Sequence, residues 1–264
     1  MSANALSAVV TAVSSTRDDT LTVCAISALA AMFGNVLHEG VGHALVALVT
    51  GTTTGTLSTV AWSSAHDTRL VAAGGTLVNI GAGLACWVGA RRDNRASARV
   101  RFFLLIASAF NLLSGTGYFL FSGVTNFGDW ADVTAGLKPS WAWRTLLIVV
   151  GAVAYYGALR LVGRALGAQP AQRIRGLMIP AYLTAVSLAC VAALSNPFGP
   201  QLMWQSALPS TAGANAGLVW MQYYVPRSEA PAECEAITRT LGWIGAAVVA
   251  ALVFILVLGR GVTL

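Results

Sequence analysis

Six apolar stretches, each about as long as a bilayer is thick, constrain this chain more than any other feature of its sequence. A transmembrane helix needs roughly 20 predominantly apolar residues. Of the 264 residues, 56% are hydrophobic and only 10% are charged. The sequence therefore predicts an all-α, multi-pass membrane protein whose residues 1–264 form a single membrane domain. The predicted spans are residues 21–49, 70–89, 102–123, 142–163, 177–195 and 238–259.

The arginines between the spans predict how the chain is oriented. Residues 91–101 hold five arginines against one aspartate, and the connection between the fourth and fifth spans holds three arginines and no acid. Because basic loops stay on the cytoplasmic side, we expect both connections, and with six spans both termini, to be cytoplasmic at the cell membrane. Residues 1–20 are then a cytoplasmic tail. The outer loops are residues 50–69, 124–141 and 196–237.

The net charge of +6 is spread over these loops rather than gathered on one patch. It therefore indicates topology and not a nucleic acid partner. The partner expected from composition is the lipid bilayer, while the oligomeric state stays open. Three of the four cysteines fall inside apolar spans and no CxxC pair occurs, so no disulfide framework is predicted.

Two segments outside the spans have their own signals. Residues 52–62 follow the first span and are rich in β-branched residues, which predicts a short strand or β-hairpin at the membrane surface. Residues 196–237 contain five prolines, which break regular structure. We expect a re-entrant piece or a lid in that loop.

Three titratable side chains stand close together inside the first span: His38, Glu39 and His43. Such groups are expensive in hydrocarbon, so they usually mark a functional site. Zinc hydrolases commonly take two imidazoles from one helix and a third ligand from elsewhere, with a nearby carboxylate as general base. His38 and His43 are therefore candidate Zn²⁺ ligands, and Glu39 is the candidate catalytic base.

The spacing of the two histidines predicts a local distortion. In the usual HExxH motif the histidines are four residues apart, whereas His38 and His43 are five apart. On a regular α-helix, five steps leave the two side chains about 140° apart. A shared ion therefore requires a π-bulge or local unwinding, and Gly40 and Gly42 lower the cost of such a backbone.

A third metal ligand must come from another segment. Asp129 follows the outer end of the third span, so on the expected topology it lies on the same side as the histidines. An Asp at this position is also a common helix cap, and the sequence leaves both roles open. His66 and Asp67, in the loop after the predicted hairpin, are the alternative metal ligands, or else a solvated pair.

The histidine segment His38–Ala44 resembles a motif of the site-2 protease family of intramembrane zinc metalloproteases. That family has HExGHA on an early transmembrane helix, and this chain has one residue inserted. The HExxxH spacing is also similar to the HExxGH signature of the soluble dipeptidyl peptidase III family, in which the longer spacing still binds zinc.

Two further segments carry the resemblance. Ala73–Asn79 is similar to the family's AGPxxN segment, with Thr76 in place of proline. Asn111–Ser114 resembles the start of the NxxPxxxLDG segment, with Ser114 in place of proline and Phe119 where the aspartate is expected.

The resemblance implies a membrane-embedded zinc metalloendopeptidase, a hydrolase of peptide bonds whose partner is a membrane-protein or peptide substrate. Its core is expected in residues 21–132, with additional helices in residues 133–264. It implies Zn²⁺ held by the two histidines, a catalytic Glu39, and Asn79 and Asn111 as polar groups near the substrate. For each asparagine, hydrogen bonding between helices is the alternative role. Two other functions stay open: a catalytically inactive relative acting as a membrane binding or scaffold protein, and a membrane lipid-amide hydrolase.

Overall fold

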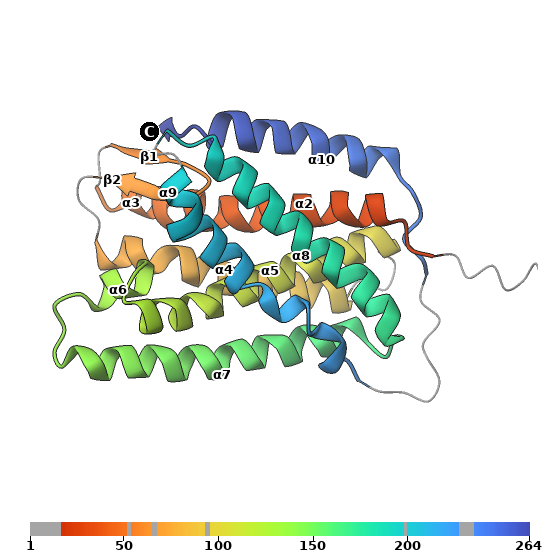
Figure 1. Cartoon of the computed structure of the whole chain (residues 1–264), viewed down its shortest axis with the longest axis horizontal. Helices are drawn as coiled ribbons and strands as arrows, with labels where there is room; N and C mark the ends of the chain where they lie inside the picture. Colours follow the sequence, from red (N-terminus) through yellow and green to blue (C-terminus); the bar gives the residue numbers. More distant parts are fainter. Residues whose placement is uncertain (1–16, 52–53, 65–67, 93–95, 198–199, 227–234) are drawn as a thin grey trace, which may run out of the picture.

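Long helices running side by side form the molecule, which we describe from a computed structural model (Figure 1). It describes residues 17–51, 54–64, 68–92, 96–197, 200–226 and 235–264. Within this part of the chain, six helices are long and apolar enough to cross a membrane, which confirms the predicted all-α, multi-pass fold. They are α2 (Thr20–Val36) continued by η1 (Leu37–Leu45) and α3 (Val46–Val49), α4 (Arg69–Arg92), α5 (Ala98–Thr125), α7 (Ser140–Leu166), α8 (Ala171–Leu194), and α10 (Leu241–Val253) continued by η6 (Phe254–Leu258).

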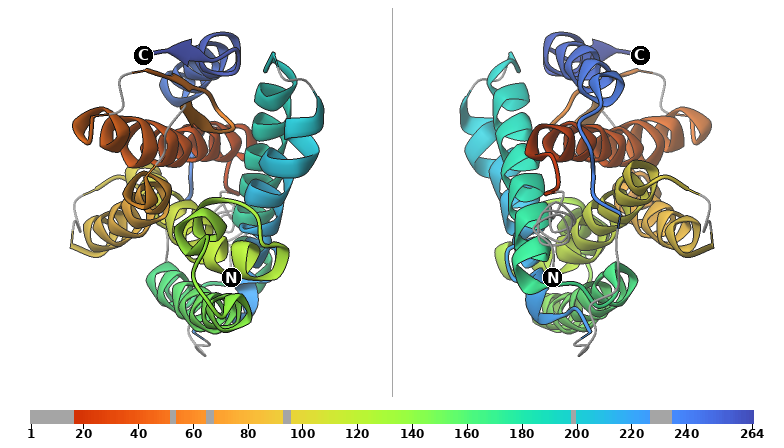
Figure 2. Two further views of the ribbon diagram at one scale, coloured as in Figure 1. Left: turned by 90° about the vertical axis from the view of Figure 1, so that its left-hand side faces the viewer. Right: turned by 90° about the vertical axis from the view of Figure 1, so that its right-hand side faces the viewer.

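The helix α5 lies at the centre of the bundle and packs against α2, α4 and α7. In the most apolar stretch of α5, 67% of the residues are buried inside the protein. The corresponding share for α10, which lies at the periphery, is 11% (Figure 2). Ile106 and Leu113 of α5 are almost fully buried in the main apolar core. The third predicted span is therefore the one around which the others assemble.

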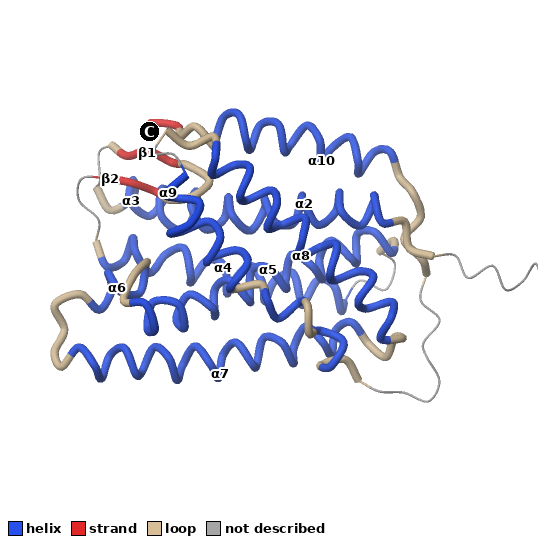
Figure 3. Tube along the Cα trace, viewed as in Figure 1, coloured by secondary structure: helices blue, strands red, loops and turns tan. Residues whose placement is uncertain are grey.

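A small sheet covers one end of the bundle (Figure 3). The strands β1 (Gly55–Leu57) and β2 (Trp62–Ser64) pair antiparallel, which confirms the hairpin predicted after the first span. A third strand, β3 (Val262–Thr263), pairs antiparallel with the other edge of β1. No sequence pattern pointed to β3, because two residues carry no periodicity and their partner is more than 200 positions away.

The helices α2, α8 and α10 all begin at the same end of the bundle. The backbone N–H of Asp19, just before α2, donates to the carbonyl of Ile237, just before α10, at 2.7 Å. Asp18 also pairs with Arg173, in the first turn of α8, at 2.9 Å. At the opposite end, the N–H of Leu264 donates to the carbonyl of Gly55 at 2.9 Å.

This arrangement corrects the predicted topology. Since α8 and α10 run in the same direction, the chain has to return along the bundle between them. The described residues 200–226 make this return, so the predicted outer loop 196–237 is not confined to one end of the bundle. Residues 17–19, just before α2, and residues 259–264, after α10, lie at opposite ends of the bundle. Six simple crossings would bring these two segments to the same end, so the chain does not follow that course. Which side of a membrane each end faces stays a prediction.

The return is made by residues 200–226, which we call the interrupted crossing. Near its start, the hydroxyl of Ser206 donates to the carbonyl of Val60, beside the hairpin. Midway, the hydroxyl of Tyr155 donates to the carbonyl of Ala214 at 2.7 Å, and Tyr224 reaches Gly163 near the far end of α7. Its short helical pieces are α9 (Pro200–Leu202), η2 (Met203–Ala207), η3 (Pro209–Gly213), η4 (Ala216–Leu218) and η5 (Met221–Tyr223).

Candidate metal centre

The first spanning helix widens where the two histidines stand. Leu37–Leu45 forms a π-helical segment, η1, between regular turns of α-helix on either side. A π-helix bonds each residue to the one five positions away, so side chains five apart come to the same face. The Nε2 atoms of His38 and His43 lie 3.2 Å apart. The predicted distortion of the helix is confirmed.

Glycines at the contact between η1 and α4 leave room for the imidazoles. Gly42 packs directly on Gly74 and Gly75, with no space for a side chain at any of the three. A Cβ atom at Gly75 would collide with Nε2 of His43 and would lie 2.7 Å from Nε2 of His38. The glycines of α4 therefore leave free the space in which the two histidine nitrogens meet.

Asp129 completes the group. It is the first residue of α6 (Asp129–Thr134), and its Oδ2 lies 3.3 Å from Nε2 of His38 and 3.4 Å from Nε2 of His43. Gly128, with φ of 82°, occupies the N-cap position of this helix, so Asp129 is not the cap. The ring of Trp130 packs on Phe119, which anchors α6 against α5.

His38, His43 and Asp129 form a group that can hold a metal ion. Their three facing atoms define a nearly equilateral triangle with sides of 3.2, 3.3 and 3.4 Å. Tetrahedral coordination with bonds of about 2.0 Å gives ligand separations of about 3.3 Å. The Oδ2 atom of Asp129 has no hydrogen bond of good geometry to a described residue, as expected for lone pairs that converge on a shared cation.

The charge of Asp129 suits this role. Burial alone favours the neutral acid, but the two imidazoles beside it hold the pKa of Asp129 well below its ordinary value. The carboxylate therefore stays ionised at neutral pH. Metal ligands bind in their deprotonated form, so Asp129 needs no proton loss to accept an ion.

The two histidines differ in what holds their second nitrogen. Nδ1 of His43 lies 2.7 Å from the carbonyl of Val71, so Nδ1 donates, and in the neutral imidazole Nε2 is the nitrogen left to bind a metal. Nδ1 of His38 is buried without a hydrogen-bond partner among the described residues. The His38 ring instead packs on the ring of Tyr118, with centroids 4.9 Å apart.

Glu39 is fixed by the hairpin. Its side chain is buried, and its Oε2 accepts a hydrogen bond of 2.9 Å from the backbone N–H of Trp62 in β2. Glu39 also lines a cavity together with His43 and Asp129. The hairpin therefore orients the carboxylate toward the space in front of the metal group.

Of the two asparagines predicted to lie near the substrate, only one lies at a cavity beside the metal group. Asn79 is buried, lines a cavity with His38 and Glu39, and has no described partner for its Oδ1. Asn111 instead donates to the carbonyl of Ala107 in its own helix at 2.8 Å and fills the space beside Gly34. It lines none of the cavities described around the metal group, and its described hydrogen bond lies within α5 rather than between helices. His66 and Asp67 lie outside the described residues.

Sequence reasoning missed the residues that enclose the site from the opposite wall. Tyr118 and Ser210 line all three cavities that meet there, and Asn215 lines one of them. Tyr118 lies two helical turns after Asn111, so their shared face was a usable signal. The interrupted crossing has no regular period that would have pointed to Ser210 or Asn215.

Comparison with protein-family models, with curated proteins and with solved structures finds no match to this chain. The function of the site is therefore argued from its own geometry.

Proposed function

We propose that the protein is a membrane-embedded, zinc-dependent hydrolase of peptide bonds. The observation that carries the proposal is the triangle of His38, His43 and Asp129 at tetrahedral spacing, with the buried carboxylate of Glu39 in the same cavity. Two imidazoles and one carboxylate leave a fourth position for water or substrate, which is the donor set of many catalytic zinc sites.

The residues divide the chemistry between them. Zinc, when bound, supplies a Lewis acid that polarises a carbonyl group and makes water more acidic. Glu39 takes a proton from the attacking water and delivers it to the leaving amine. Because its Oε2 accepts the Trp62 N–H, the Oε1 atom is the one available for proton transfer. The bond from His43 to the carbonyl of Val71 keeps that imidazole in the ligating form.

An apolar groove supports a substrate that comes from the bilayer. A cavity of about 510 Å³ lies between α5, α7 and the interrupted crossing, and its lining is mainly apolar. It shares Tyr118 and Ser210 with the cavity that contains Glu39 and Asp129. A substrate segment lying in the groove would therefore approach the metal group from the side of Tyr118 and Ser210.

The same groove is wide and apolar enough for an acyl chain, which keeps a lipid-amide hydrolase as the second candidate. Both candidates use the same metal and the same base, so they differ only in the substrate. An inactive relative that binds metal is the third outcome that an experiment must separate.

The test combines metal content with turnover. We expect purified protein to hold one zinc per chain, Glu39→Gln to keep the zinc and lose hydrolysis, and His43→Ala to lose both. Peptide substrates and fatty-acid amides are assayed side by side. Cleavage of lipid amides alone would replace the peptidase assignment, and zinc without any turnover would leave a binding protein. Protein that never retains metal would end the proposal.

A further inference from the structure

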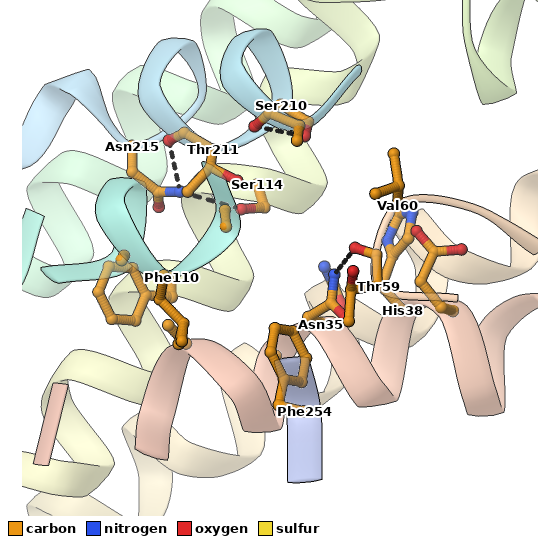
Figure 4. A pocket seen from close by; sticks show the side chains of 18 of the residues that line it. Asn35, His38, Thr59, Val60, Phe110, Ser114, Ser210, Thr211, Asn215 and Phe254 are labelled. Atoms are coloured by element: carbon orange, nitrogen blue, oxygen red, sulfur yellow. Dashed lines mark hydrogen bonds between the residues drawn. The ribbon is translucent and has the colours of Figure 1, made fainter. Parts of the chain in front are cut away.

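A chamber of about 80 Å³ lies behind the metal group, deeper in the bundle. At one side of it stand His38, Asn35 and Thr59, and at the other stand Asn215 and Ser114, with Phe254 along the lower side of the view (Figure 4). Its volume is room for several water molecules or for one side chain. His38 and Glu39 form part of its wall, so the chamber adjoins the metal group.

The wall opposite His38 contains a buried oxygen, Oδ1 of Asn215, that accepts no hydrogen bond from a described residue. Asn215 is 3% exposed, and its Nδ2 donates to the carbonyl of Thr211 at 3.0 Å and to Oγ of Ser114 at 3.4 Å. These two bonds fix the carboxamide, so its Oδ1 is the free atom, and it has no partner among the described residues. An unmade hydrogen bond of a buried oxygen is costly, so Asn215 is poised for a donor from a ligand or from water.

The rest of the chamber decides what kind of donor fits. Ala185, Leu188 and Phe110 give it apolar surfaces. Among the described lining residues, the only carboxylate is Glu39, at the metal end. A cation at the Asn215 end would be buried without a counter-charge, which is unfavourable. A neutral O–H or N–H group on an apolar body meets no such penalty.

We infer that the chamber binds the substrate side chain beside the scissile bond, and that Asn215 selects one with an apolar body and a neutral hydrogen-bond donor at its tip, as in Tyr or Gln. This inference rests on the proposed function, because the chamber matters only if the metal group holds substrate. It assigns a role to the interrupted crossing, which supplies the acceptor from a part of the chain remote from the metal ligands.

Metal-binding hydroxamates test the inference without requiring turnover. The zinc-loaded protein in detergent is titrated with acetohydroxamate, which has no side chain, and with the hydroxamates of N-acetyl-phenylalanine and N-acetyl-tyrosine. We expect the tyrosine compound to bind about tenfold more tightly than the phenylalanine compound, because it satisfies the buried oxygen. In Asn215→Ala this preference should disappear, while acetohydroxamate binds as in the wild type.

A second variant guards against a folding defect at position 215. Ala189→Leu narrows the chamber from α8 and leaves the Asn215 side chain itself in place, so it should weaken both aromatic hydroxamates at least tenfold and leave acetohydroxamate unchanged. Equal binding of the two aromatic compounds to the wild type, or no effect of Ala189→Leu, overturns the inference while the metal site stands. Failure of acetohydroxamate to bind zinc-loaded protein counts against the proposed function itself, and the inference falls with it.

Discussion

Nε2 of His38 lies 3.2 Å from Nε2 of His43, although the two residues are five positions apart in the chain. On an α-helix they would point to different sides. The π-helical segment between Leu37 and Leu45 brings them together. A single extra residue relative to HExxH is therefore absorbed by the backbone, and the two imidazoles still face one point.

The carboxylate of Asp129 is expected to contribute directly to metal affinity. Asp129→Asn replaces a charged ligand by a neutral one at 3.3 Å from His38, so zinc affinity should fall by about 100-fold or more. Competition with a fluorescent chelator measures this change. Asp132→Asn, in the same short helix, is the matched control and should bind zinc as the wild type does. Equal affinities for the two variants would remove Asp129 from the ligand set.

The glycine at position 75 should be intolerant of even one methyl group. In Gly75→Ala the new Cβ meets the ligating nitrogens of both histidines, so we expect zinc binding to be lost. Gly81→Ala, in the same helix, has open space around the new methyl group among the described atoms and should keep its zinc. Metal analysis of the two purified variants gives the answer, and full zinc occupancy in Gly75→Ala would refute the observed packing.

The cap of the first helix should make stability depend on pH in acid. Thr22 donates to the Asp19 carboxylate from its hydroxyl and its backbone N–H, and these bonds lower the pKa of Asp19. A lowered pKa in the folded state stabilises the protein above the ordinary Asp value of 3.8, and this contribution is lost as the pH falls through the lowered pKa.

Asp19→Asn isolates the charge, because asparagine caps helices about as well as aspartate. The wild type should have the higher unfolding temperature at pH 7, and the difference should shrink toward zero in strong acid. Thermal unfolding in detergent across this range is the measurement. A difference that does not change with pH would mean that the charge of Asp19 does not act through this cap.

The course of the chain predicts that its C-terminal residues and the connection between α7 and α8 are exposed on opposite sides of the membrane. With the native cysteines replaced, single cysteines at Lys138, Ala168 and Leu264 can be labelled with a membrane-impermeant maleimide. The connection before α7, which contains residue 138, and the C-terminus lie at one end of the bundle, and the connection between α7 and α8, which contains residue 168, lies at the other (Figure 1). We expect the first two to be labelled from the same side and the third from the opposite side. Labelling of residues 168 and 264 from one side would contradict the interrupted crossing.

Features set by residues close together in the sequence could be predicted, and features set by contacts between distant parts of the chain could not. The spans and the distortion at His38–His43 are local, since hydropathy and residue spacing determine them. The position of Asp129 near the histidines could be predicted because Asp129 follows the end of α5 that lies on their side of the bundle. Asn215 was not, because the interrupted crossing is broken by Pro200 and Pro209 and is held by contacts such as Tyr155 to Ala214. The topology prediction failed at the same place, since it counted only regular apolar helices.

The pairing of β3 with β1 has a consequence for biogenesis. Val262 faces Leu57 across the ladder, and the hairpin that contains Leu57 also supplies the N–H that holds Glu39. The ribosome has to translate beyond residue 262 before this sheet can gain its third strand. The carboxylate of Glu39 thus rests on a sheet whose third strand is translated after His38, Glu39, His43 and Asp129, so a nascent chain would contain these four residues before the sheet that holds Glu39 could be complete.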